Sequence, residues 1–272
     1  MTPLRRAVPL SPRSVVALVL ASIIGLAMFA WPLVLPASGA TTPTVQSPYF
    51  FVVVVGIIVA LALTQVLDGG LDAKALAMLG VLSAVNAALR PLGAGLGGFE
   101  TVFFILILAG RVFGPGFGFL LGCTSLFASA LLTAGVGPWL PFQMLAAAWI
   151  GLAAGALPDG FRGKPLRSPG EIVMLAVLGV VAGYLYGFVM NLWFWPFLAG
   201  NSGAIGYLPG APLLENLRRF VLYCLATSAA VWDTVRAVTN AVLIVILGPG
   251  VLAVFRRAVR RANFAPDVKL VA

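Results

Sequence analysis

The sequence contains no histidine, and charged residues make up only 9% of its 272 residues. Without imidazole the chain lacks both the commonest transition-metal ligand and the base of a Ser-His-Asp triad, so imidazole metal sites and such triads are excluded. No Gly-x-x-x-x-Gly-Lys-Ser/Thr phosphate loop occurs, so the chain is not expected to hydrolyse ATP itself. An average soluble domain has about 25% charged residues. The shortage of charge therefore excludes an ordinary soluble protein.

Cysteine is also scarce, and Cys123 and Cys224 both lie in apolar surroundings. Buried cysteines commonly act as small apolar side chains, so two separate thiols are favoured over a disulfide. With no metal-ligand cluster and no catalytic motif in the sequence, we expect no cofactor and no enzymatic activity.

Hydrophobic residues, in contrast, make up 61% of the chain, and its mean hydropathy is +1.07. A membrane-spanning helix needs about 20 apolar residues, whereas a transmembrane barrel would show shorter segments of alternating polarity. The apolar stretches are nearly continuous, which predicts an all-α polytopic membrane protein with about eight transmembrane helices. The expected spans are residues 15–35, 49–67, 73–89, 99–113, 117–134, 142–157, 171–195 and 231–255. Residues 213–230 are ambiguous, because they either lie along the membrane interface or extend the last helix.

The first span resembles a signal peptide, because arginines precede it and small residues follow it. Its apolar run is longer than the 7–15 residues typical of a signal core, so a retained span is favoured.

The net charge of +9 is concentrated at the segment ends, where it indicates topology rather than nucleic-acid binding. With the N-terminus inside, all but four of the 17 basic residues lie on the cytoplasmic side. We therefore expect a multi-pass protein of the cell membrane with both termini cytoplasmic. The glycine-rich connections at residues 90–98 and 135–141 then lie outside.

Polar side chains within or next to membrane spans are costly and often mark functional sites. They gather near the outer ends of the predicted spans and suggest a cavity for a neutral, ring-containing, hydrogen-bonding solute. Asp233 and Arg236 are spaced to pair on one helical face. An Arg90–Glu100 pair is also expected, as a structural clasp or as ligand contacts, and the aromatic residues serve as an interfacial belt or as stacking groups. The candidate substrate-binding residues are Asn86, Arg90, Glu100, Trp139, Gln143, Tyr184, Asn191, Asp233, Arg236 and Asn240.

Small residues recur along the third predicted span, mostly at intervals of four. This spacing places them on one helical face, where another helix can approach closely. The face either packs within the protein or docks a separate membrane subunit. Its residues are Ala73, Ala77, Gly80, Ala84 and Ala88.

Three stretches of the sequence resemble the substrate-binding S components of energy-coupling factor (ECF) transporters. They are GFE at residues 98–100, GRVFGPGFG at residues 110–118 and GVGPWLPFQM at residues 135–144. The resemblance implies a six-helix core that binds a vitamin near the outer face, and it identifies the small-residue face as the docking site for a partner. The partners it implies are a transmembrane coupling subunit and two ATPase subunits, besides membrane lipid.

The expected organisation is a two-helix addition at residues 1–70, a substrate-binding core at residues 71–258 and a cytoplasmic tail at residues 259–272. Cobalamin is the first expectation for the vitamin, because the outer mouth is rich in aromatic residues, and riboflavin or another vitamin comes next. A membrane-embedded transferase would need an inner acidic motif, for which only Asp68 and Asp72 are available. A stand-alone secondary transporter would show inverted repeats, and no such symmetry is evident.

Overall fold

The computed structural model describes residues 7–34, 43–68, 71–93, 97–161, 164–165, 168–197 and 203–262. The fold is all-helical, which confirms the predicted class. The α-helices are α1 (Pro12–Val34), α2 (Pro43–Leu67), α3 (Ala73–Leu89), α4 (Val102–Phe113), α5 (Pro115–Leu132), α6 (Leu140–Ala156), α7 (Ser168–Phe194), α8 (Leu213–Cys224) and α9 (Thr234–Ala262). Short 3-10 turns, η1 (Arg90–Gly93) and η2 (Trp195–Phe197), follow α3 and α7, and a π-helical segment, η3 (Leu225–Asp233), joins α8 to α9. A two-stranded hairpin of β1 (Gly160–Phe161) and β2 (Lys164–Pro165) connects α6 to α7.

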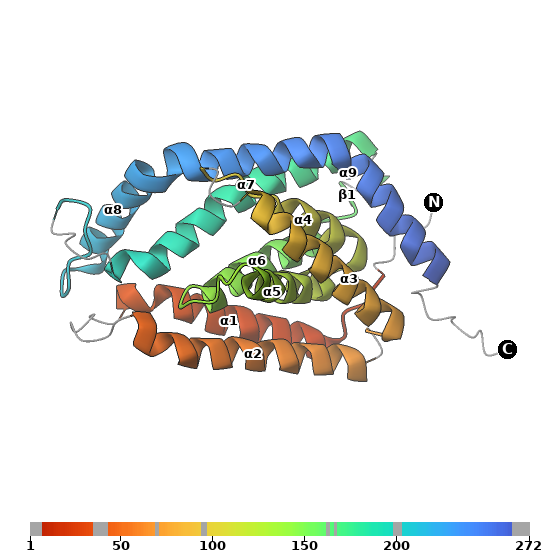
Figure 1. Ribbon diagram of the computed structural model, residues 1–272, viewed down its shortest axis with the longest axis horizontal. Helices are drawn as coiled ribbons and strands as arrows, with labels where there is room; N and C mark the ends of the chain where they lie inside the picture. The colour runs from red at the N-terminus through yellow and green to blue at the C-terminus, as the bar shows by residue number, and fades with distance from the viewer. Residues whose placement is uncertain are drawn as a thin grey trace.

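Successive helices run back and forth between two ends of the molecule (Figure 1). The start of α1, the hairpin and the end of α9 lie at one end, here called the hairpin end. The α3–α4 and α5–α6 connections point toward the other end, which carries α8. This arrangement agrees with the predicted alternation, in which both glycine-rich connections share one side of the membrane.

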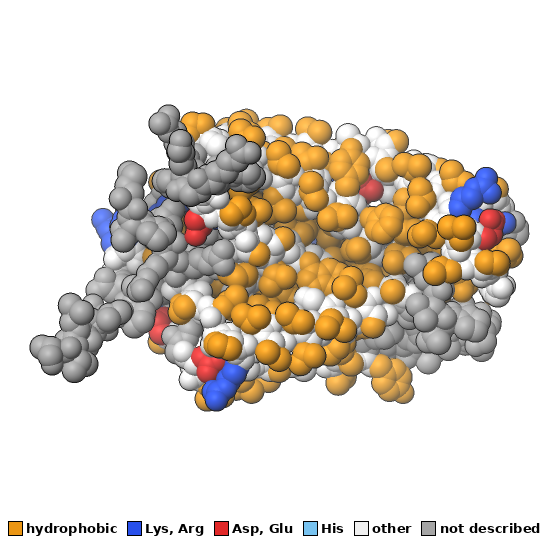
Figure 2. All heavy atoms as spheres, turned by 180° about the vertical axis from the view of Figure 1, so that it is seen from behind, with side chains coloured by type: hydrophobic (Ala, Val, Ile, Leu, Met, Phe, Trp, Pro, Cys, Tyr) orange, Lys and Arg blue, Asp and Glu red, His pale blue; other side chains and the backbone are white. Residues whose placement is uncertain are grey.

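Five helical segments are long and apolar enough to cross a bilayer, and α2, α4 and α6 contain shorter apolar stretches. Figure 2 shows apolar side chains covering most of the visible face, with charged side chains of both signs near its two ends. Exposed valines and leucines on α1, α2, α7 and α9 contribute to this surface. An apolar exterior of this kind fits hydrocarbon, so the chain is a multi-pass membrane protein.

Helix α4 differs from the predicted span of residues 99–113. It has only 12 residues, about 18 Å of helix, and begins at Val102 after a non-helical stretch. All 12 residues are buried, because α5, α6, α7 and α9 pack around it. A fully buried helix and a lipid-facing helix are both apolar all round, which is why hydropathy alone suggested a longer span.

Glycines allow α5 and α6 to pack backbone against backbone. A β-carbon on Gly118 would overlap the carbonyl group of Gly151, and one on Gly151 would overlap that of Gly118. Such close approach is the usual benefit of small residues in membrane helices. It explains why the sequence between α4 and α6 contains so much glycine.

The helix that contains α8, η3 and α9 is continuous, so residues 213–230 extend the last helix. The segment Leu213–Arg261 has 49 residues, or about 75 Å if it were straight. Figure 1 shows instead that α8 turns away from α9 and that α9 bends before its end. Pro249 lies inside α9 and accounts for a bend, because proline cannot donate the backbone hydrogen bond that a straight helix requires. Helix α9 reaches Ala262, so the first residues of the expected tail are helical.

Helices α1 and α2 pack against each other and lie against α5, α6, α7 and α8. Phe29 of α1 packs edge-on against Phe142 of α6, with 5.1 Å between the ring centroids. Trp149 of α6 donates a hydrogen bond from Nε1 to Oγ of Ser22, at 3.2 Å. These contacts attach the N-terminal helix pair to the side of the remaining bundle.

Candidate functional site

A cavity of about 270 Å³ opens among the α3–α4 connection, the α5–α6 connection and the start of α9. Its lining includes Arg90, Glu100, Trp139 and Arg236, four of the ten predicted binding residues. Trp232 also lines it, together with Gly93 and Gly98 from the first glycine-rich connection. The structure therefore brings both glycine-rich connections and the last helix together around one cavity.

The prediction of a direct ion pair between Arg90 and Glu100 is wrong. No carboxylate of the described residues lies within 4.0 Å of the Arg90 guanidinium, which donates from Nη2 to Oε1 of Gln143, at 2.9 Å. Glu100 lies two residues before the start of α4, and the Val102 amide at that N-terminus lowers the pKa of its carboxyl. Free amides and the helix dipole make this N-terminus attractive to an anion. The two side chains thus share a cavity but have separate polar partners.

Glu100 is half-buried in the connection between α3 and α4. Burial raises the pKa of its carboxyl above the ordinary value, since the charged form loses hydration. The positive charges of Arg90 and Arg236 and the amide of Val102 oppose this rise in pKa.

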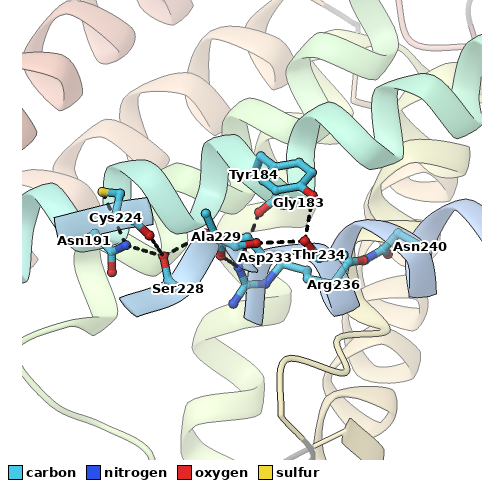
Figure 3. Close-up of polar contacts among 10 residues, drawn as sticks. All are labelled: Gly183, Tyr184, Asn191, Cys224, Ser228, Ala229, Asp233, Thr234, Arg236 and Asn240. Carbon is cyan, nitrogen blue, oxygen red and sulfur yellow. Dashed lines mark hydrogen bonds and ion pairs between the residues drawn. The ribbon is translucent and has the colours of Figure 1, made fainter. Parts of the chain in front are cut away.

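The predicted Asp233–Arg236 pair is confirmed. Arg236 Nη1 lies 2.6 Å from Asp233 Oδ1 and 3.3 Å from the carbonyl oxygen of Gly183 (Figure 3). Its guanidinium carbon lies 5.2 Å from the centroid of the Tyr186 ring, within the range of a cation–π contact. Glycine at position 187 leaves room for the Asp233 carboxylate between α7 and the last helix. The pair thus fixes one cationic group in the cavity wall.

A hydrogen-bonded relay extends from this pair along η3, as Figure 3 shows. Ser228 Oγ donates to Asp233 Oδ2 at 2.8 Å, and Asn191 Nδ2 donates to Ser228 Oγ at 2.6 Å. The hydrogen bonds of a π-helix join residues five apart, so such residues lie on the same face. In an α-helix they lie on different faces. The sequence prediction missed Ser228, because nothing in the residue pattern distinguishes a π-helix from an α-helix.

The remaining predicted binding residues support the site from outside the cavity. Tyr184 hydrogen-bonds to Thr234 at 2.7 Å, and Asn191 belongs to the relay. Asn240 is fully buried and donates to the carbonyl oxygens of Glu100 and Arg236, at 2.9 and 2.8 Å. Asn86 is also buried and donates to Ser125 Oγ at 3.0 Å, which ties α3 to α5.

The small-residue face of α3 is exposed. All five predicted docking residues (Ala73, Ala77, Gly80, Ala84 and Ala88) point away from the bundle, whereas Leu79, Leu82 and Asn86 are buried on the opposite side. A β-carbon on Gly80 would meet no other atom of the described residues within 4 Å. This face therefore does not pack within the described part of the protein, which was one of the two alternatives.

The two aspartates between α2 and α3, Asp68 and Asp72, have local structural roles. Asp68 accepts hydrogen bonds from Ser11 and from Arg13, the latter at 3.3 Å. Asp72 caps α3 by accepting a hydrogen bond from the Ala75 amide at 2.7 Å. Gly69 and Gly70, which lie between them, are outside the described residues. Each of these two aspartates thus has a local structural partner.

Both cysteines are free and buried, so the prediction of two separate thiols is confirmed.

Comparison with known proteins matches one family model, the substrate-specific component of the ECF transporter, to residues 74–253. Searches of curated proteins and of solved structures found no match. The matched region begins in α3, ends in α9 and contains every residue that lines the cavity. This chain belongs to the family of ECF transporter substrate-specific components.

Proposed function

We propose that the chain binds a small ring-containing solute in the cavity at the α8 end and releases it on the hairpin side. A transmembrane coupling subunit and two ATPase subunits supply the energy. Membership in the family of substrate-specific components supports this assignment. The cavity between the two glycine-rich connections is the observation that carries it.

The size of the cavity bears on the identity of the solute. Its volume of about 270 Å³ lies just below the ~300–1,000 Å³ of typical small-molecule pockets. Cobalamin, the first expectation from the sequence, has a corrin ring with a nucleotide loop and is too large for this space. The volume therefore supports a smaller vitamin-like solute with one or two rings.

The lining supports recognition of a flat ring that carries hydrogen-bonding groups. Trp139 and Trp232 line the cavity from different elements and remain 41% and 47% exposed. Exposed indoles at the edge of an apolar bundle offer stacking surfaces, and they are also suited to the membrane interface. Arg90, Glu100 and Arg236 add donors and acceptors at the same cavity.

The exposed face of α3 supports a separate coupling subunit. Small residues reduce the distance between helix backbones, so a partner helix can pack closely along this face. The chain has no phosphate loop, so the energy of ATP must come from another subunit. We place the hairpin end and both termini in the cytoplasm of a cell-membrane protein, because most basic residues gather there.

The test uses purified chain and proteoliposomes. A panel of vitamins is screened for thermal stabilisation of the chain in detergent, because a ligand that binds only the folded state raises its stability. The stabilising solute is then offered, in labelled form, to liposomes that contain either the chain alone or the chain with its coupling and ATPase subunits. ATP-dependent accumulation only in the complete complex is expected. Accumulation by the chain alone under an ion gradient would identify a secondary transporter instead.

A further inference from the structure

Of the three charged side chains that line the cavity, Arg236 has an ion-pair partner among the described residues, whereas Arg90 and Glu100 do not. Arg236 pairs with Asp233 at 2.6 Å, and Arg111 and Arg256 pair with Glu171 at 2.8 and 2.7 Å. Arg90 and Glu100 have no counter-ion within 4.0 Å among the residues that the structure describes. Both of them line the cavity.

Leaving two charges without ion pairs is costly in a membrane protein, where the surroundings have a low dielectric constant. Arg90 instead donates to the neutral amide of Gln143, and Glu100 lies beside the amide end of α4 at Val102. These partners orient the two groups without neutralising them. One cationic and one anionic group are therefore available to a solute in the cavity.

We propose that the solute is zwitterionic, with an anionic group that meets Arg90 and a protonated nitrogen that meets Glu100. This inference rests on the proposed function. A singly anionic solute would meet the unneutralised charge of Glu100, and a singly cationic solute would meet that of Arg90. An uncharged solute would displace water from Arg90 and Glu100 without offering either charge an opposite charge in return, which is unfavourable. A zwitterion satisfies both charges and keeps the complex electrically balanced.

The test compares ring-containing probes of different charge on the detergent-purified chain. Tryptophan and phenylalanine represent zwitterions, thiamine a cation, nicotinate and biotin anions, and riboflavin an uncharged solute. We expect the zwitterionic probes to stabilise the chain most. Arg90→Gln and Glu100→Gln should each weaken zwitterion binding by about ten- to a hundredfold, as expected for the loss of a charged contact.

The decisive readout is a change in charge preference, which a purely structural role would not produce. Arg90→Gln should shift the preference toward thiamine, and Glu100→Gln should shift it toward nicotinate or biotin. Arg218→Gln is the control, because Arg218 lies on α8, is largely exposed and does not line the cavity. Its binding profile should equal that of the unmodified chain.

A pH series gives a second readout. The pKa of Glu100 is raised by burial, and the charges facing it are Arg90 and Arg236. Zwitterion binding should weaken as the pH falls through this raised pKa, because protonated Glu100 no longer attracts a cationic nitrogen. Glu100→Gln should remove this pH dependence.

The outcomes separate this inference from the proposed function. Preferential binding of riboflavin, thiamine or an anionic vitamin, with no change of preference in either variant, would overturn the zwitterion and leave the transport function intact. Absence of binding by every probe, together with no uptake by the complete complex, would overturn the proposed function and this inference with it.

Discussion

Gly98 lies directly against the backbone of Trp232, and a β-carbon on Gly98 would come within 2.8 Å of the Trp232 α-carbon. Gly98 also has a φ of 95°, a conformation that residues with a side chain rarely adopt. This contact joins the first glycine-rich connection to the π-helical segment η3. Since both residues line the cavity, their contact forms part of its wall.

Replacing Gly98 by alanine should push the connection away from Trp232 and weaken solute binding. The positive φ adds a cost of about 1–2 kcal/mol to the folded state. Gly97→Ala is a matched control, because Gly97 has a φ of 52° but no described atom within 4 Å of an added β-carbon. Thermal stability and solute affinity are measured for both variants. Equal affinities would show that the contact with Trp232 does not shape the cavity.

Replacing Ala84 or Ala88 by leucine should leave solute binding unchanged but abolish transport. The added side chain projects from the exposed face of α3 and keeps a partner helix at a greater distance. Co-purification with the coupling subunit and uptake by the complete complex are measured. Ala60→Leu, at an exposed position of α2, is the control and should transport normally. Normal transport by the α3 variants would remove this face as the docking site.

Arg90→Ala should weaken solute binding by about 1.5–3 kcal/mol, because a charged hydrogen bond is lost. Gln143→Ala should cost about 1 kcal/mol, since Gln143 accepts a hydrogen bond from Arg90 and acts by orienting it. The double variant should therefore bind little worse than Arg90→Ala alone. Isothermal titration of all four proteins measures this coupling. Strictly additive losses would mean that the two residues act independently.

Glu171→Gln should strongly destabilise the protein. Glu171 is buried at the hairpin end and accepts charged hydrogen bonds from Arg111 and Arg256, which joins α7 to α4 and α9. Removing one member of a buried ion-pair network typically costs about 3–5 kcal/mol. Glu215→Gln, in a partly exposed pair with Arg219, should cost at most about 1 kcal/mol. Detergent melting curves that shift equally in both variants would contradict a structural role for the buried network.

Single cysteines introduced at residues 95 and 137 should react with a membrane-impermeant thiol reagent added to intact cells. A cysteine at residue 163 should react only after permeabilisation, because we place the hairpin end in the cytoplasm. Residues 95 and 163 lie outside the described residues, whereas residue 137 lies in the α5–α6 connection. The native cysteines are buried and should contribute little background. Labelling of residue 163 from outside would contradict the proposed orientation and would place the cavity on the cytoplasmic side.

Much of the fold follows from the sequence alone, because crossing a bilayer requires long apolar helices with their backbone hydrogen bonds satisfied internally. Local spacing also predicted the Asp233–Arg236 pair, since residues three apart share a helical face. The same periodicity identified the small-residue face of α3. The division into an N-terminal pair, a core and a tail stays a prediction.

Tertiary structure decided what depends on residues far apart in the chain. Arg90 donates a hydrogen bond to Gln143, 53 positions away, because η1 and the start of α6 meet beside the cavity. Glu100 lies at the start of α4 and makes no ion pair with Arg90. Hydropathy cannot distinguish a helix surrounded by protein from one surrounded by lipid, so only packing shows that α4 is central and short. The π-helical turn that aligns Ser228 with Asp233 is likewise visible only in the structure, because the residue pattern is compatible with an ordinary α-helix.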